Sequence, residues 1–199
     1  MALFVGLLVL LIVGALAAST YLSPRNRDFP SNASAYSFQG FVLSLSLNST
    51  RLAPGSSVAV EASINSTSPY ILNLTARESW PLDKRALLAC DHGQPLGAGV
   101  VRGFYTEFNY SSAPRLLSVA LAMFCPPLVG LPADYFLLQP GSSSAVASSK
   151  GTAHHEDLQS TLVLTAGAGV GADKLTPGVY TIIAADEWGD LAIVHLRIS

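Results

Sequence analysis

Ten short segments of this chain have a strand-like pattern, and their repetition is the feature that most constrains its fold. In residues 41–47 apolar and Ser side chains largely alternate, and in residues 58–64 every second side chain is apolar. A period of two predicts strands with one face on a core and the other in water. The ten segments are residues 41–47, 58–64, 70–76, 98–106, 116–124, 135–139, 144–148, 161–165, 179–185 and 191–198. Beyond residue 22 no segment has an amphipathic helical pattern, so we predict an all-β sandwich or barrel.

Three Pro-Gly pairs mark turns between these segments, at residues 54–55, 140–141 and 177–178. Pro fixes φ at the first central position of a turn, and Gly allows a positive φ at the second. The pairs therefore predict three type II turns, each leading into the next strand. Residues 186–190 are predicted to join the last two strands as a hairpin, with Gly189 in the left-handed conformation.

The sequence around these turns resembles a known family. An L-x-P-G-S-S-V-A-V segment begins at Leu52, an L-x-P-G-S-S turn begins at Leu138, and an L-x-P-G-x-Y strand begins at Leu175, before a D-x-W-G hairpin. These motifs are similar to those of immunoglobulin-like, cell-adhesion-related domains in surface proteins of archaea and bacteria. The resemblance implies an immunoglobulin-like antiparallel β-sandwich and a surface-exposed, non-catalytic module, but it transfers no functional residue. Residues 77–137 and 150–174 are interpreted as insertions into such a domain.

The chain begins with an apolar segment, residues 2–18, which has no charged or strongly polar side chain. Its length lies between a signal-peptide core of roughly 7–15 residues and a membrane-spanning helix of roughly 17–25. Ala15-Leu16-Ala17 fits a cleavage site, whereas no Lys or Arg precedes the segment as a signal peptide requires. We therefore predict a signal peptide or transmembrane anchor helix at residues 1–22. A linker is predicted at 23–37 and one extracytoplasmic β-sandwich domain at 38–199.

The charge composition excludes two classes of protein. The chain has 11 Lys and Arg against 13 Asp and Glu, a balance that provides no basic surface for nucleic acid. Hydrophobic residues make up 50% of the chain, which excludes intrinsic disorder.

Asparagine usage indicates the compartment. Five of the six asparagines begin an N-x-[ST] acceptor sequence for N-glycosylation, or sequon, with no Pro at x: Asn32, Asn48, Asn65, Asn73 and Asn109. Ser and Thr make up 34 of the 199 residues, so about one asparagine in six should do so by chance. We therefore predict N-glycosylation at these five positions, which would place the domain outside the cytoplasm.

Cysteine usage fits the same compartment. Cys90 and Cys125 are the two cysteines of the chain. An even number in an exported protein predicts one disulfide, which would close a loop of about 35 residues. Two unpaired buried thiols are the alternative.

The densest group of polar ligands is His154-His155-Glu156-Asp157. A zinc protease helix would need His-Glu-x-x-His, but Gln159 occupies the position of the second His. We interpret the group as a solvated loop, with a surface metal site as the alternative.

A copper site of the cupredoxin type would use Cys90 and His92. Such a site needs a second His and usually an axial Met near the Cys, but Met123 lies beside Cys125, where no His follows. We therefore predict no metal or other cofactor. His92, His154 and His155 remain weak candidates for an exported metal-binding, cupredoxin-like domain.

Two further groups have a structural interpretation. The acidic residues of segment 186–190 lack the spacing of a calcium loop, so we interpret the segment as a polar hairpin tip. The aromatic residues, including Trp80, Trp188 and those of segment 104–110, are expected to pack in the core more than to form a binding surface.

No segment of the sequence specifies a catalytic site. Residues 167–172 match G-x-G-x-x-A, but Pro177-Gly178 follows too soon for the helix that a dinucleotide site needs. No G-x-S-x-G nucleophile elbow is present.

We predict a non-catalytic glycoprotein of the cell membrane with an extracytoplasmic domain, or a secreted one after cleavage, with a structural or adhesive role. The alternatives are a metal-binding domain and a filament subunit whose segment 31–38 adds to a neighbour's sheet. Expected partners are the membrane, other envelope proteins or glycans, and copies of this chain, but not nucleic acid.

Overall fold

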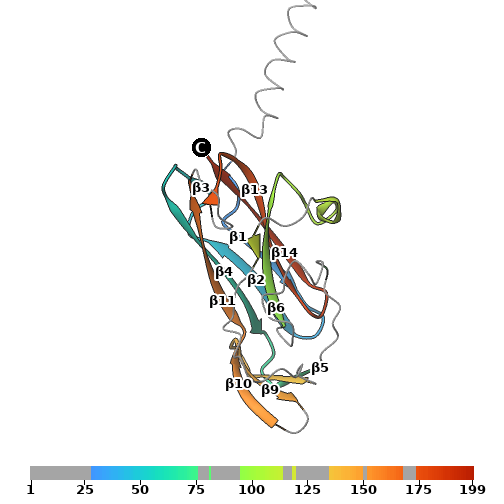
Figure 1. Ribbon diagram of the computed structural model, residues 1–199. Helices are drawn as coiled ribbons and strands as arrows, with labels where there is room; N and C mark the ends of the chain where they lie inside the picture. The colour runs from blue at the N-terminus through green and yellow to red at the C-terminus, as the bar shows by residue number, and fades with distance from the viewer. Residues whose placement is uncertain are drawn as a thin grey trace, which may run out of the picture.

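The computed structural model describes residues 28–75, 81, 95–113, 118–119, 135–149, 152–167 and 174–199, which form three β-sheets (Figure 1). Sheet A has the order β1 (Asn32–Tyr36), β2 (Phe41–Leu47), β4 (Ser57–Ser66), β11 (Gln159–Ala166) and β12 (Lys174–Leu175). Sheet B has the order β3 (Arg51–Leu52), β14 (Leu191–Ile198), β13 (Gly178–Asp186), β6 (Leu96–Arg102) and β7 (Ser118–Val119). Sheet C has the order β10 (Thr152–Asp157), β9 (Ser144–Ser149), β8 (Tyr135–Leu138) and β5 (Leu72–Thr75).

The prediction of an all-β chain with antiparallel sheets is confirmed. Every neighbouring pair of strands is antiparallel except β11–β12 and β14–β3. Each of the ten predicted segments overlaps one strand of the structure. The one helical element among the described residues is the short 3₁₀ turn η1 (Tyr110–Ser112). The predicted N-terminal helix lies outside the described residues, among which no helix is long and apolar enough to span a membrane.

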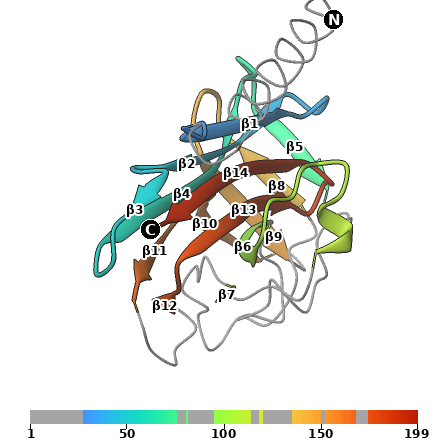
Figure 2. The ribbon, with the colours of Figure 1, turned by 90° about the horizontal axis from the view of Figure 1, so that it is seen from above.

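Sheets A and B pack face to face, and the alternation of their strands builds the core between them (Figure 2). In β2, Phe41, Leu43 and Leu45 are fully buried, whereas the intervening side chains are only half-buried. Strands β4 and β14 alternate in the same way. Strand β13 is instead buried on both faces, because Tyr105, Tyr110 and their neighbours cover its outer side.

Trp188 joins sheet C to this core. Its ring contacts Phe41 of sheet A at a centroid distance of 5.3 Å and Phe136 of sheet C at 5.8 Å. Its indole N–H donates to the carbonyl oxygen of Thr75 in β5, at 2.9 Å. The interpretation of residues 186–190 as a polar hairpin tip is therefore wrong, since Trp188, Asp186 and Glu187 are all buried.

The predicted turns are confirmed in part. Gly55 has φ +80°, and the N–H of Ser56 donates to the carbonyl oxygen of Ala53, as a type II turn requires. Gly141 has φ +61°, and Gly189 has φ +102° as predicted. Gly178 is not at the third position of a type II turn. It is the first residue of strand β13, where it pairs with Ile198 and has φ +154°.

Three segments correct the sequence analysis. Residues 32–36, which fell in the predicted linker, form β1 and pair with β2 of the same chain, so only the other edge of this strand is left for a neighbour's sheet. Residues 159–166, assigned to an insertion, form β11, an interior strand of sheet A. The supposed loop His154-His155-Glu156-Asp157 belongs to β10, which backbone hydrogen bonds hold against β9 despite its polar sequence.

Candidate functional site: a hydroxyl-rich face of sheet A

The outward face of sheet A carries mainly hydroxyl and amide side chains. Strands β2 and β4 place Ser44 opposite Ser63 and Ser46 opposite Glu61. Strand β11 then places Gln159 opposite Ser63 and Thr161 opposite Glu61. The alternation that buries the apolar residues of these strands thus aligns their polar residues in rows on the other face.

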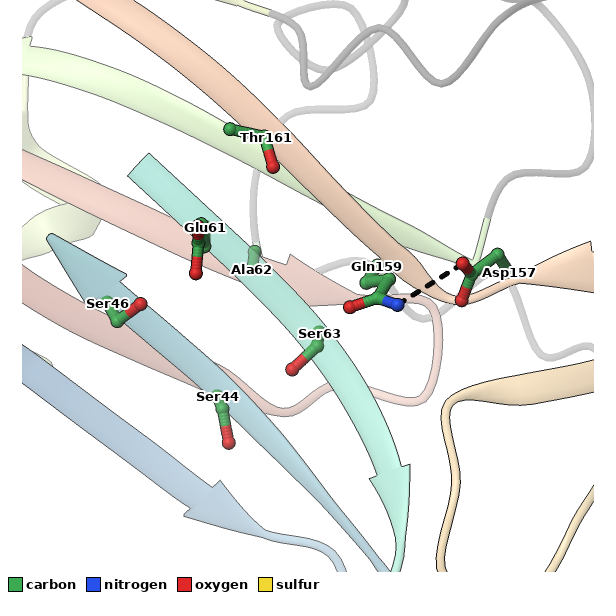
Figure 3. A pocket seen from close by; sticks show the side chains of 8 residues that line it. All are labelled: Ser44, Ser46, Glu61, Ala62, Ser63, Asp157, Gln159 and Thr161. Carbon is green, nitrogen blue, oxygen red and sulfur yellow. Dashed lines mark hydrogen bonds between the residues drawn. The ribbon is translucent and has the colours of Figure 1, made fainter. Parts of the chain in front are cut away.

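These rows line a shallow open depression with a volume of about 300 Å³ (Figure 3). Its lining residues are Ser44, Ser46, Glu61, Ala62, Ser63, Asp157, Gln159 and Thr161. Asp157 lies at the junction of β10 and β11, where its two carboxylate oxygens accept hydrogen bonds from Ser143 Oγ and Gln159 Nε2, each at 3.2 Å. These bonds hold the carboxylate at one end of the depression.

The lining defines what this depression can do chemically. Each Ser or Thr hydroxyl both donates and accepts hydrogen bonds, and the carboxylates of Glu61 and Asp157 accept them. The lining has no histidine, cysteine, lysine or arginine. The depression is therefore a hydrogen-bonding surface with two carboxylates, on which polyhydroxylated groups could both donate and accept hydrogen bonds.

The five sequon asparagines all lie among the described residues, outside the core. Four are exposed, and Asn65 is half-buried. Asn32 and Asn65 are on the same face as the depression, opposite Ser46 and Val42 respectively. Asn48 and Asn109 use their side-chain oxygens to accept backbone N–H groups, from Ala59 at 2.9 Å and from Thr106 at 2.7 Å.

Asn65 is bonded differently. Its Nδ2 donates to Ser63 Oγ at 2.7 Å, so the nitrogen that would carry a glycan is already engaged. The structure therefore separates one partly shielded sequon from four open ones, which the sequence motif does not do.

Most of the predicted disulfide and metal-binding residues lie outside the part of the chain that the structure describes. Cys90, Cys125 and His92 lie outside the described residues, as does the side chain of His154, whereas His155 is exposed on β10. Among the side chains that the structure describes, no three His, Cys, Asp or Glu residues form a group that could hold a metal ion.

The aromatic residues divide between the core and the surface. Trp188 is in the core, Tyr105 and Tyr110 pack on the outer side of β13, and Trp80 lies outside the described residues. Phe104 and Phe108 are exposed, Phe108 to 96%. The preference for core packing thus holds for some of these residues and not for others.

A stack of rings that no sequence motif indicates lies at the start of the described chain. The ring of His195 stacks on Phe104 at a centroid distance of 4.0 Å and lies 5.4 Å from the ring of Phe29. Burial lowers the pKa of His195, and its Nε2 lies 2.7 Å from the carbonyl oxygen of Tyr105, to which it donates. The contacts of Phe29 with Phe104 and with the neutral ring of His195 therefore hold the segment just before β1 against sheet B.

Asp186 is a buried carboxyl that the sequence pattern also failed to identify. Its Oδ1 accepts the backbone N–H groups of Trp188 and Asp190, each at 2.9 Å. Its Oδ2 has no hydrogen-bond partner within the described part of the chain. Desolvation raises the pKa of Asp186 to about 7.

Comparisons with known proteins leave this chain without an assigned family. No protein-family model and no curated protein matches it. Among solved structures, a β-glucosidase from Listeria innocua matches in complex with gluconolactone, with 14% identity and a TM-score of 0.36, and in complex with isofagomine, with 14% identity and a TM-score of 0.35. The matches cover 83% and 82% of this chain but only 17% of the enzyme chain in each case. Similarity at this level carries no inference about activity.

Proposed function

We propose that this chain is a non-catalytic, N-glycosylated protein of the cell envelope, with a structural or adhesive role. Its domain is an immunoglobulin-like β-sandwich, held at the membrane by the apolar segment at residues 1–22. The observation that carries the proposal is the position of the five sequon asparagines, which all lie outside the core, four of them exposed. Asparagine is usually exposed in folded proteins, so the position adds to a count that chance does not explain: five of the six asparagines begin a sequon, and none of these five is buried.

The surface composition supports the same function. The hydroxyl-rich face of sheet A has one charged residue, Glu61, in the middle of its strands. Only 12% of the residues are charged, so charged side chains contribute little to the hydration of the surface. A glycan at Asn32 would hydrate this face, and the face itself offers hydrogen bonds to the sugars of neighbouring envelope molecules.

The location of the domain can be tested on intact cells of the native host. We expect an amine-reactive reagent that does not cross membranes to label the protein before lysis, because all three lysines follow the apolar segment. Membrane fractions should retain the labelled protein if the segment is not cleaved. A cytoplasmic protein, labelled only after lysis, is the control. If this protein also reacts only after lysis, the proposed location is wrong.

A further inference from the structure

The three sheets end in edge strands whose outer backbone groups have no strand partner within the described residues: β1 and β12, β3 and β7, β10 and β5. An unpaired edge is a template for pairing with another chain, and natural proteins block it with charged side chains or Pro. Strand β3 contains Arg51, β12 contains Lys174, and β10 contains Glu156 and Asp157. Strand β7 is only two residues long and has undescribed residues on both sides.

Strands β1 and β5 lack this protection. Their sequences, NASAY and LNLT, contain neither a charged residue nor Pro. Both contain a sequon asparagine, Asn32 in β1 and Asn73 in β5, and both asparagines are exposed. The other three sequons lie in a turn, in a loop and in the interior strand β4. Two of the five sequons are thus on β1 and β5, the two edge strands longer than two residues whose sequences have no charged residue and no Pro.

The surroundings of these edges make them prone to association. Tyr36 and Phe38, at the end of β1, are 79% and 84% exposed. Tyr70 and Ile71, just before β5, are 77% and 57% exposed. The two groups lie near each other, because the turn at Gly40 approaches the side chain of Leu72. The unprotected edges therefore border an apolar end of the molecule, which would add buried area to any pairing of strands.

We propose that N-glycans on Asn32 and Asn73 prevent strands β1 and β5 from pairing with the same edges of a second copy of this chain. Side chains opposite each other on paired strands have Cβ atoms only about 4.5–5.5 Å apart, so a glycan on an edge strand overlaps the side chains of an incoming strand on that face of the sheet. The proposal rests on the glycosylation in the proposed function, and it assigns these two sites a role that the others do not have. A second copy is the partner because an antiparallel pair of identical edges is self-complementary.

Removing the sequons while keeping their asparagines tests this proposal. Ser34→Ala with Thr75→Ala abolishes both sequons, and the backbone carbonyl of Thr75 that accepts from Trp188 is retained. Ser111→Ala, which abolishes the sequon of Asn109 in a loop, is the matched control. All proteins are made in the native host, their glycans are counted by mass, and their association is measured by sedimentation velocity. We expect the double variant to associate at least tenfold more tightly than the wild type and Ser111→Ala.

Lysines on strands β1 and β5 should prevent the pairing of these edges in place of the glycans. Ser34→Lys with Thr75→Lys also abolishes both sequons, but it places lysines on exposed positions of the edges, and we expect this variant to sediment like the wild type. If the alanine variant lacks both glycans and does not associate, or if the lysine variant associates equally, the proposal is wrong. It is also wrong if the wild type carries glycans elsewhere but none on Asn32 and Asn73. A wild type without any glycan would instead overturn the glycosylation on which the proposal rests.

Discussion

Replacing Trp188 by alanine is expected to lower the free energy of unfolding by about 3–5 kcal/mol, as measured by chemical denaturation. The indole is 6% exposed and contacts Phe41 and Phe136, which belong to different sheets. Its removal leaves a cavity where sheet C meets the sandwich, and it leaves the carbonyl of Thr75 without its donor. Because this ring is one of the contacts between sheet C and the core, its removal should speed the exchange of backbone amides with solvent more in β5 and β8 than in β13.

Trp188→Phe separates packing from hydrogen bonding. Phenylalanine retains most of the ring contacts but cannot donate to Thr75, so we expect a loss of about 1–2 kcal/mol. If Trp188→Ala changes the free energy of unfolding by less than about 1 kcal/mol, the ring does not join the sheets as described.

Asp186 is expected to make the protein less stable as pH rises from about 4 to 7. Its pKa is raised from 3.8 to about 7, chiefly by desolvation, with a contribution from the nearby charge of Asp190. A raised pKa in the folded state means that the folded protein holds the proton more tightly than the unfolded chain. The resulting stabilisation is fully present below the pKa of the unfolded chain, 3.8, and is lost as pH rises through the folded-state pKa of about 7. The total loss of unfolding free energy is about 4 kcal/mol.

Asp186→Asn isolates this effect from other titrating groups. Asparagine is neutral at every pH, and its oxygen can still accept from Trp188 and Asp190. We expect thermal and chemical denaturation to show the variant gaining stability relative to the wild type between pH 4 and 7. Asp186→Ala should show the same slope at lower stability, because it leaves both N–H groups without an acceptor. Parallel curves for wild type and Asp186→Asn would show that this carboxyl does not titrate in the window.

The sequence predicted strands well where one face is buried and poorly where burial is slight. Strands β2, β4 and β14 alternate because each has one face on the core. Strand β1 places only Ala33 and Ala35 toward the core, so its sequence has the composition of a linker. Strand β10 is held by pairing with β9, which requires no apolar pattern.

The sequence predicted the parts of the candidate site but not their assembly. Alternation in β2 places Ser44 and Ser46 on the outer face. Their position beside Thr161 depends on the pairing of β4 with β11, which joins Glu61 to a residue 100 positions later. Asp186 was misjudged because acidic residues in a hairpin usually face water, whereas this hairpin is buried beside Trp188, which packs against sheets A and C.

Intact-mass analysis of the protein purified from its native host shows whether the chain is N-glycosylated. We expect a mass above that of the polypeptide by several glycans, on up to five asparagines. Peptide mapping of the same sample should find Asn65 the least occupied, since it is half-buried and its Nδ2 is engaged. The same spectrum shows whether residues 1–22 have been removed. A mass equal to that of the bare chain, with or without those residues, would contradict the claim that this is an N-glycosylated protein of the cell envelope.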